Sequence, residues 1–362
     1  MLSKGKVFMQ QRRKWLIITI CVILAVALLT GLRLKYHYDE VHKNEGTKQK
    51  VQINNKKVNS FIDITYSEAI PNSRLDIITP RNLDRDNKLP IIFWLHGGGY
   101  IAGDKQYKNP LLAEIAEQGY IIVNIDYALA PEYRYPTQLQ QMDAAVRFMK
   151  RNTHKLPIDF NQVVIGGDSA GAQMASQYIA MQTNQKLREN MHFEQQFQPD
   201  AIKAAIFYGG FYDMKTVKAT EFPRIQLFME SYTGEHAWDK QFKNLSQMST
   251  INHITEDYPA TFLSVGDADP FVSQNQSFNE ALNAKNIPVS TFFYDGSHHL
   301  KHQYQFHLEL PESKRNIEET LKFLSRNTSS STFNQSSDSD EGVTLDPVSY
   351  THLRAHETRH DL

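Results

Sequence analysis

Two glycine-rich segments hold the residues of this sequence whose types and spacing could do chemistry. The first reads HGGG at residues 96–99, and the second reads GDSAG at residues 167–171. Each directly follows a short apolar run of the kind that forms a buried strand. A serine between small residues at a strand end is typical of a sharp strand-to-helix turn that exposes its hydroxyl. The sequence therefore predicts a nucleophile at Ser169.

The same two segments could supply backbone donors for a developing negative charge. Ala170 would begin a helix, where N–H groups lack partners and the helix dipole favours an anion. Glycines let the main chain approach a tetrahedral oxyanion closely, and Gly98 and Gly99 are placed to do so. We expect the N–H groups of Gly98, Gly99 and Ala170 to form an oxyanion hole.

A serine hydroxyl is a weak nucleophile at neutral pH, so it needs an imidazole base oriented by a carboxylate. In proteins with this turn the chain order is serine, acid, histidine. Asp267 and Asp269 follow the apolar run at residues 260–265. Asp269 is the predicted acid because Pro270 restricts it to an extended conformation. Asp267 is predicted to cap the turn.

Several histidines could be the base, because they follow the last apolar run, at residues 289–294. His298, His299 and His302 all lie in one loop of suitable length, and spacing does not choose among them. His307 lies further along the chain and is the weakest candidate.

Short β-rich runs and helical stretches alternate along the chain and must position these residues. Leu139, Met142, Val146 and Met149 keep a helical spacing that predicts a helix over residues 138–150. Strands are predicted at residues 61–66, 75–79, 91–95, 121–125, 163–165, 204–208, 260–265 and 289–294. This alternation predicts an α/β fold with a doubly wound, mostly parallel sheet covered on both faces.

Taken together, these motifs resemble the hormone-sensitive-lipase-type branch of the α/β-hydrolase superfamily over roughly residues 60–326. The segment DYALAPE at residues 126–132 is similar to the branch's Y-R-L-A-P-E, although Ala128 stands where arginine is usual. Members carry the acid just before the proline of a D-P pair, which supports Asp269. The segment HQYQF from His302 is similar to the H-E-Y-Q-F of bacterial members and favours His302 as the base, whereas the branch's H-G-F version would favour His299.

The resemblance implies an α/β-hydrolase fold whose helical cap comes partly from an insertion at about residues 211–258. Large apolar side chains of this insertion could line an acyl pocket or pack the cap onto the body: Phe222, Leu227, Phe228, Met229, Tyr232 and Trp238.

The implied activity is that of a serine carboxylic-ester hydrolase acting on short-to-medium acyl esters. It would use the triad Ser169, His302 and Asp269, form an acyl-enzyme intermediate, and need no metal or cofactor. One alternative keeps the triad but makes the protein an amidase or a deacetylase of acetylated cell-surface glycans. Another is a catalytically inactive binding module, since one fold can serve many functions.

Residues 16–32 form an apolar run of seventeen positions without a charge, entered after Arg12, Arg13 and Lys14. At about 1.5 Å per residue this run nearly spans a hydrocarbon core, which predicts a transmembrane signal-anchor. The alternative is a signal peptide cleaved near Ala25-Val26-Ala27. Residues 1–15 are expected in the cytoplasm because the first fourteen contain no acid. The catalytic domain is then expected outside the cytoplasm, beyond a polar stalk at residues 33–59.

The composition limits the possible partners and cross-links of the protein, and the C-terminal residues are unlike the rest of the chain. The 362 residues contain 39 Lys+Arg against 40 Asp+Glu, which gives no electrostatic reason to expect a nucleic-acid partner, and one Cys, which excludes an internal disulfide. Residues 327–342 are rich in serine and aspartate and are predicted to be a disordered tail. Residues 343–362 contain VSYTHLRAHET, which resembles a translated sequencing adapter, so we predict that they are not native and disregard their histidines.

Overall fold

A computed structural model of the chain describes residues 53–198 and 200–329, together with seven positions between residues 14 and 32. The predicted cytoplasmic segment, anchor, stalk up to residue 52 and tail beyond residue 329 lie largely outside the described residues. None of the described helices has both the length and the apolar character that crossing a membrane requires.

An eight-stranded sheet forms the centre of the fold, in the order β1-β2-β4-β3-β5-β6-β7-β8. Strands β3 to β8 pair in parallel, whereas β1 and β2 are antiparallel to their neighbours. The strands are β1 (Val58–Thr65), β2 (Arg74–Pro80), β3 (Leu89–Leu95), β4 (Ile121–Ile125), β5 (Ile158–Asp168), β6 (Ile202–Tyr208), β7 (Ala260–Val265) and β8 (Val289–Phe293). The predicted mostly parallel sheet is confirmed.

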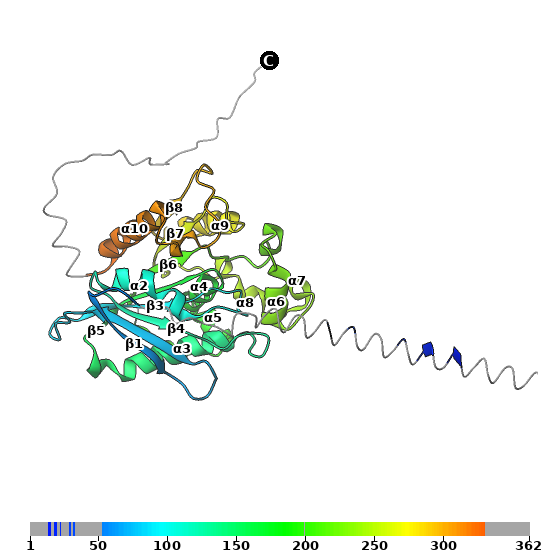
Figure 1. The fold of residues 1–362 in the computed structure, drawn as a ribbon, viewed down its shortest axis with the longest axis horizontal. Helices are drawn as coiled ribbons and strands as arrows, with labels where there is room; N and C mark the ends of the chain where they lie inside the picture. Colours follow the sequence, from blue (N-terminus) through cyan, green and yellow to red (C-terminus); the bar gives the residue numbers. More distant parts are fainter. Residues whose placement is uncertain are drawn as a thin grey trace, which may run out of the picture.

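Helices cover both faces of this sheet (Figure 1). Apolar side chains of α3, α4 and α9 share one buried cluster with the sheet, and those of α2 and α10 share a second cluster on the other face. The α-helices are α2 (Asn109–Ala116), α3 (Thr137–Arg151), α4 (Ala170–Thr183), α5 (Gln185–Asn190), α6 (Ile225–Thr233), α7 (Trp238–Gln241), α8 (Leu245–Met248), α9 (Val272–Asn283) and α10 (Pro311–Asn327). The 3₁₀ turns are η1 (Lys105–Tyr107), η2 (Thr153–Lys155), η3 (Val217–Thr220), η4 (Thr250–Asn252) and η5 (Tyr304–Phe306).

Strand β3 shows why the sequence of a central strand is a continuous apolar run. All seven of its residues are buried. Because side chains alternate between the faces of a strand, Ile91 and Phe93 join the first cluster, while Ile92 and Trp94 join the second. A strand covered on both faces has no solvent side to hold polar residues.

The folded domain extends slightly beyond both predicted limits. At the start, the side-chain amide of Asn55 donates to Glu117 over 2.8 Å, so the chain is already packed before the predicted end of the stalk at residue 59. At the end, α10 runs to Asn327, and the buried Thr328 hydroxyl lies 3.0 Å from the Tyr120 hydroxyl. The predicted tail therefore begins at least two residues too early, because these polar side chains find partners far away in sequence.

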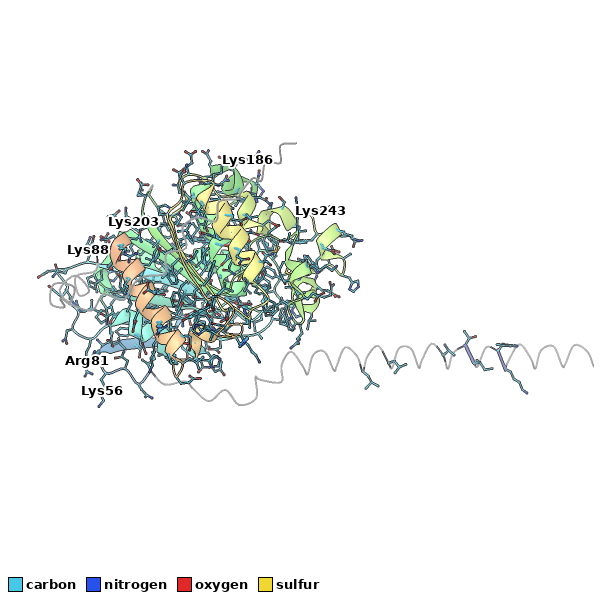
Figure 2. The ribbon with its side chains drawn as sticks, turned by 90° about the horizontal axis from the view of Figure 1, so that it is seen from above. Lys56, Arg81, Lys88, Lys186, Lys203 and Lys243 are labelled. Atoms are coloured by element: carbon cyan, nitrogen blue, oxygen red, sulfur yellow. The ribbon has the colours of Figure 1, made fainter. Side chains whose placement is uncertain are left out.

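The predicted cap insertion, between β6 and β7, contains η3, α6, α7, α8 and η4. In Figure 1 the helices α6 and α7 lie at one side of the folded domain. In Figure 2 Lys243, between α7 and α8, lies at the opposite end of the domain from Lys56, Arg81 and Lys88. The cap therefore lies on the side of the domain opposite to Lys56, near the start of the continuously described residues.

Candidate active site

Ser169 lies in a tight turn between β5 and α4, as the GDSAG motif predicts. Its backbone has φ 53° and ψ −121°, a strained conformation for a residue with a side chain. Gly171 permits the close packing of α4, because a Cβ there would lie 2.0 Å from the carbonyl oxygen of Leu95 on β3. The turn therefore holds the Ser169 hydroxyl at the carboxyl edge of the sheet.

Three of the predicted site residues meet through hydrogen bonds. His302 Nε2 lies 3.0 Å from Ser169 Oγ, and His302 Nδ1 lies 2.7 Å from Asp269 Oδ2. Since an ionised carboxylate only accepts, Nδ1 carries the ring proton and Nε2 is left to accept from the serine hydroxyl. Asp269 is buried, and its other oxygen accepts the Phe271 N–H over 2.9 Å. This arrangement can take a proton from Ser169 and stabilise the resulting imidazolium.

The other candidate histidines lie apart from Ser169. His298 and His299 are exposed, and the His298 ring lies 3.2 Å from Glu312 on α10. His307 is exposed too, and its ring lies 3.2 Å from Glu309, although the residue borders a cleft that Ser169 also lines. The loop between β8 and α10 thus brings only His302 to the serine.

Asp267 holds the start of this histidine loop. Its carboxylate accepts the backbone N–H groups of His298, His299 and Leu300 over 2.8, 3.0 and 2.6 Å. The Ala268 N–H donates back to the Leu300 carbonyl over 2.9 Å. The residue therefore ties the loop after β7 to the loop after β8, a longer-range version of the capping role that the sequence suggested.

The substitution Asp267→Asn is expected to lower the free energy of unfolding at neutral pH. It should also make this free energy depend less on pH in the acid range. Partial burial acts to raise the pKa of this carboxyl, but the hydrogen bonds from Leu300, His298 and His299 outweigh it and hold the pKa below its usual value. Such a group stabilises the fold above the unfolded-state pKa of about 3.9, and this contribution is lost as the pH falls through the lower folded-state pKa.

Urea unfolding of Asp267→Asn at pH 7 and at a series of lower pH values measures the effect. Asp86→Asn, in the exposed loop between β2 and β3, is the matched control. If Asp267→Asn kept the pH dependence of the wild-type chain, the carboxylate would not anchor the loop.

The segment HGGG at residues 96–99, here called the oxyanion loop, follows β3 and turns sharply beside the nucleophile. Gly98 and Gly99 have φ 124° and 60°, and a Cβ on Gly98 would lie 1.9 Å from the carbonyl oxygen of Ala102. Only glycine fits this turn without strain. Both glycines line the same cleft as Ser169, and Ala170 is the first residue of α4. The structure thus brings all three predicted donor residues around the serine, and their role remains a prediction.

Buried groups beyond the predicted site residues support this loop. The Asp168 carboxylate accepts the Gly97 N–H over 3.0 Å and the Trp94 indole N–H over 3.1 Å. The Tyr127 hydroxyl donates to the His96 carbonyl over 2.6 Å, and the two rings stack with centroids 4.2 Å apart. Asp168 was visible within GDSAG, but nothing in the sequence identified its partners.

The cleft at Ser169 has a volume of about 580 Å³ and is partly walled by the cap. Of the apolar side chains predicted to line an acyl pocket, Phe222 and Phe228 border it. Met229, Tyr232 and Trp238 are fully buried and pack the cap onto the body, and Leu227 packs against the same core. Phe228 touches the oxyanion loop, since a Cβ on Gly99 would lie 2.6 Å from its ring.

Two aromatic rings enclose the imidazole of His302. Phe222 from the cap meets it edge-on with centroids 4.8 Å apart, and Phe271 meets it at 5.5 Å. Phe222 and Phe271 stack on each other at 4.3 Å. Only about a fifth of the His302 side chain is exposed, at 21%. The base therefore works from a largely water-excluded position, which strengthens its electrostatic interactions.

Comparisons with known proteins place the chain among carboxylic ester hydrolases. The family model described as BD-FAE matches residues 75–285. The protein named "Probable carboxylic ester hydrolase LipM" from Mycobacterium tuberculosis is 26% identical over 216 residues, which cover 59% of this chain and 49% of that protein. An acetyl esterase of Salmonella schwarzengrund is 22% identical over 242 residues, covering 65% of this chain and 72% of the esterase.

A similar fold occurs among solved structures. Esterase B from Lactobacillus rhamnosis superposes with a TM-score of 0.68 at 20% sequence identity, covering 87% of this chain and 98% of that one. At this identity the likeness concerns the fold alone. It confirms the α/β-hydrolase architecture that the motifs predicted.

Proposed function

The chain belongs to the BD-FAE family and is a carboxylic ester hydrolase, and we propose that it cleaves its substrates through a triad of Ser169, His302 and Asp269. The observation that carries this proposal is the continuous hydrogen-bonded path from Ser169 Oγ to His302 Nε2 at 3.0 Å and from His302 Nδ1 to Asp269 Oδ2 at 2.7 Å.

In the proposed reaction Ser169 Oγ attacks the acyl carbonyl carbon while His302 Nε2 accepts the hydroxyl proton. The N–H groups of Gly98, Gly99 and Ala170 stabilise the oxyanion. The intermediate collapses, the alcohol leaves with the proton from His302, and the acyl group stays on Ser169. Water then gives a proton to His302 and attacks the acyl-enzyme. His302 returns this proton to Ser169 Oγ as the acid leaves, which restores the serine hydroxyl.

We propose short-to-medium acyl esters as the substrate class. A cleft of about 580 Å³ lies within the usual range of small-molecule sites. Its apolar wall of Phe222 and Phe228 suits an acyl chain, and one relative is named an acetyl esterase. Because that relative is named an acetyl esterase, a deacetylase that uses the same triad is the second candidate function.

Labelling with a fluorophosphonate probe, followed by peptide mapping, tests the mechanism directly. We expect one modified residue, Ser169, because the probe reacts with a serine only when a base activates it. An unlabelled protein would instead favour the inactive binding module. Rates on 4-nitrophenyl esters of increasing acyl length, an anilide and an acetylated sugar then separate the esterase from the amidase and the deacetylase.

We also propose that residues 16–32 anchor the enzyme in a membrane and that the catalytic domain lies outside the cytoplasm. The support is the uncharged apolar run of these residues and the basic, acid-free segment before it. Protease treatment of intact cells tests the orientation: the catalytic domain should be released, and complete protection would refute an external location. An N-terminal sequence that begins after Ala27 would identify a cleaved signal peptide instead.

A further inference from the structure

Lys108 places a cation beside the catalytic groups. It lies between η1 and α2, its side chain is only 14% exposed, and it lines the cleft at Ser169. Its Nζ lies 2.8 Å from Asp168 Oδ2, 3.2 Å from Gln303 Oε1 and 3.7 Å from the centre of the Phe306 ring. One ammonium group therefore contacts three residues from two segments of the chain, the end of β5 and the segment from Gln303 to Phe306.

The first neighbour, Asp168, directly precedes the nucleophile and is completely buried. The oxygen that meets Lys108 also accepts the Gly97 N–H from the oxyanion loop over 3.0 Å. A buried carboxylate is costly unless it is paired and hydrogen-bonded, so Lys108 provides its charge partner. Through this carboxylate the ammonium is linked to the turn that holds Ser169 and to the loop that holds Gly98.

The other neighbours belong to the segment that carries the base. Gln303 directly follows His302 and has φ 68°, a conformation in which a residue with a side chain is strained. Phe306 packs edge-on against Trp94 and Tyr208 at 6.4 and 6.1 Å, which fixes it against the sheet. Lys108 thus contacts side chains of the segment that follows His302, and it also contacts the side chain of the residue that precedes Ser169.

We propose that Lys108 is a positioning residue that sets the alignment of Ser169, His302 and the oxyanion loop, by joining Asp168 to Gln303. The inference rests on the proposed triad. Proximity and orientation supply a large part of enzymatic rate enhancement, and a displacement of about 1 Å can cost about a hundredfold in rate. Lys108 acts on geometry, so its loss should lower kcat while KM for a neutral ester changes little.

The test compares Lys108→Met, Lys108→Arg and Gln303→Leu with wild-type enzyme on a neutral 4-nitrophenyl ester. All rates are divided by the number of sites titrated with a fluorophosphonate, so that unfolded protein does not count. We expect Lys108→Met to lower kcat by about ten- to a hundredfold with KM nearly unchanged. Lys108→Arg should recover part of the loss because it keeps the charge and the donors.

Gln303→Leu removes the second contact while leaving the buried Asp168 pair intact, so it remains informative if Lys108→Met fails to fold. It should lower kcat less than Lys108→Met, and the double variant should lose no more than Lys108→Met alone, because both changes break one linkage. Lys186→Met, on α5 at an exposed position (Figure 2), is the matched control, because Lys186 is not among the residues that line the cleft.

Three results would overturn the proposal: an unchanged kcat per titrated site in Lys108→Met, an unchanged kcat in Gln303→Leu, or a rise in KM alone, which would make Lys108 a substrate contact. Failure of the triad itself is recognised separately, because wild-type enzyme would then show no label on Ser169.

Discussion

Replacing Ser169 with alanine is expected to lower ester hydrolysis by at least about 10⁴-fold, because the triad members act as a unit and the serine supplies the attacking oxygen. The fold should survive the change. Alanine removes only a hydroxyl, and although Ser169 occupies the N-cap position of α4, its side chain makes no capping hydrogen bond there. Initial rates on a 4-nitrophenyl ester and a thermal unfolding curve measure the two effects.

The matched control is Ser297→Ala, in an exposed turn of the loop that follows β8. Its hydroxyl contacts only the side chain of Asp295, at 2.6 Å, among the described interactions, so its activity should equal that of the wild type. Substantial hydrolysis by folded Ser169→Ala would show that another group attacks the ester.

The second large effect is expected at His302. His302→Ala should lower kcat by about 10⁴-fold, because the serine then lacks both a base and the group that returns the proton to the alcohol. His298→Ala and His299→Ala are the natural controls, since all three histidines share one loop. Their rings are exposed, and no described hydrogen bond joins them to Ser169. Both variants should keep rates close to that of the wild-type enzyme.

These three variants decide between the two motif alignments that the sequence allowed, one with His302 as the base and one with His299. If His299→Ala were inactive and His302→Ala active, the loop would have to adopt another conformation during catalysis. A loss in all three would indicate a general weakening of the loop, which thermal unfolding would reveal as a shared fall in Tm.

The parallel strands were predictable because burial on both faces leaves an unmistakable apolar run. The limits of β4 and β7 agree with the predicted ones, whereas β5 begins at Ile158, five residues before the predicted start. Its early residues are partly exposed and include Asp159 and Asn161. Strand order was beyond prediction, because the pairing of β2 with β4 joins residues about fifty positions apart.

The candidate site was predictable where a motif has a strict geometric reason. The GDSAG and HGGG segments need glycine at crowded turns, so their composition marks Ser169 and the oxyanion loop. The choice among the histidines depends instead on a loop conformation that three backbone hydrogen bonds to Asp267 fix. The spacing of residues in the sequence does not reveal these hydrogen bonds. Lys108 lies about sixty residues before its partner Asp168 and belongs to no motif, so only the fold brings it to the site.

The contact between Phe222 and His302 has a consequence for directed evolution of this enzyme. A cap residue that borders the cleft would normally be a first choice for changing substrate range. Here the same ring lies against the base at 4.8 Å and stacks on Phe271, which follows Asp269 by two positions. Substitutions at Phe222 should therefore change turnover together with selectivity. Libraries that aim to shift acyl preference should leave Phe222 intact and vary Phe228 on α6, with turnover measured for each variant, because the Phe228 ring borders the cleft but also lies against Gly99 of the oxyanion loop.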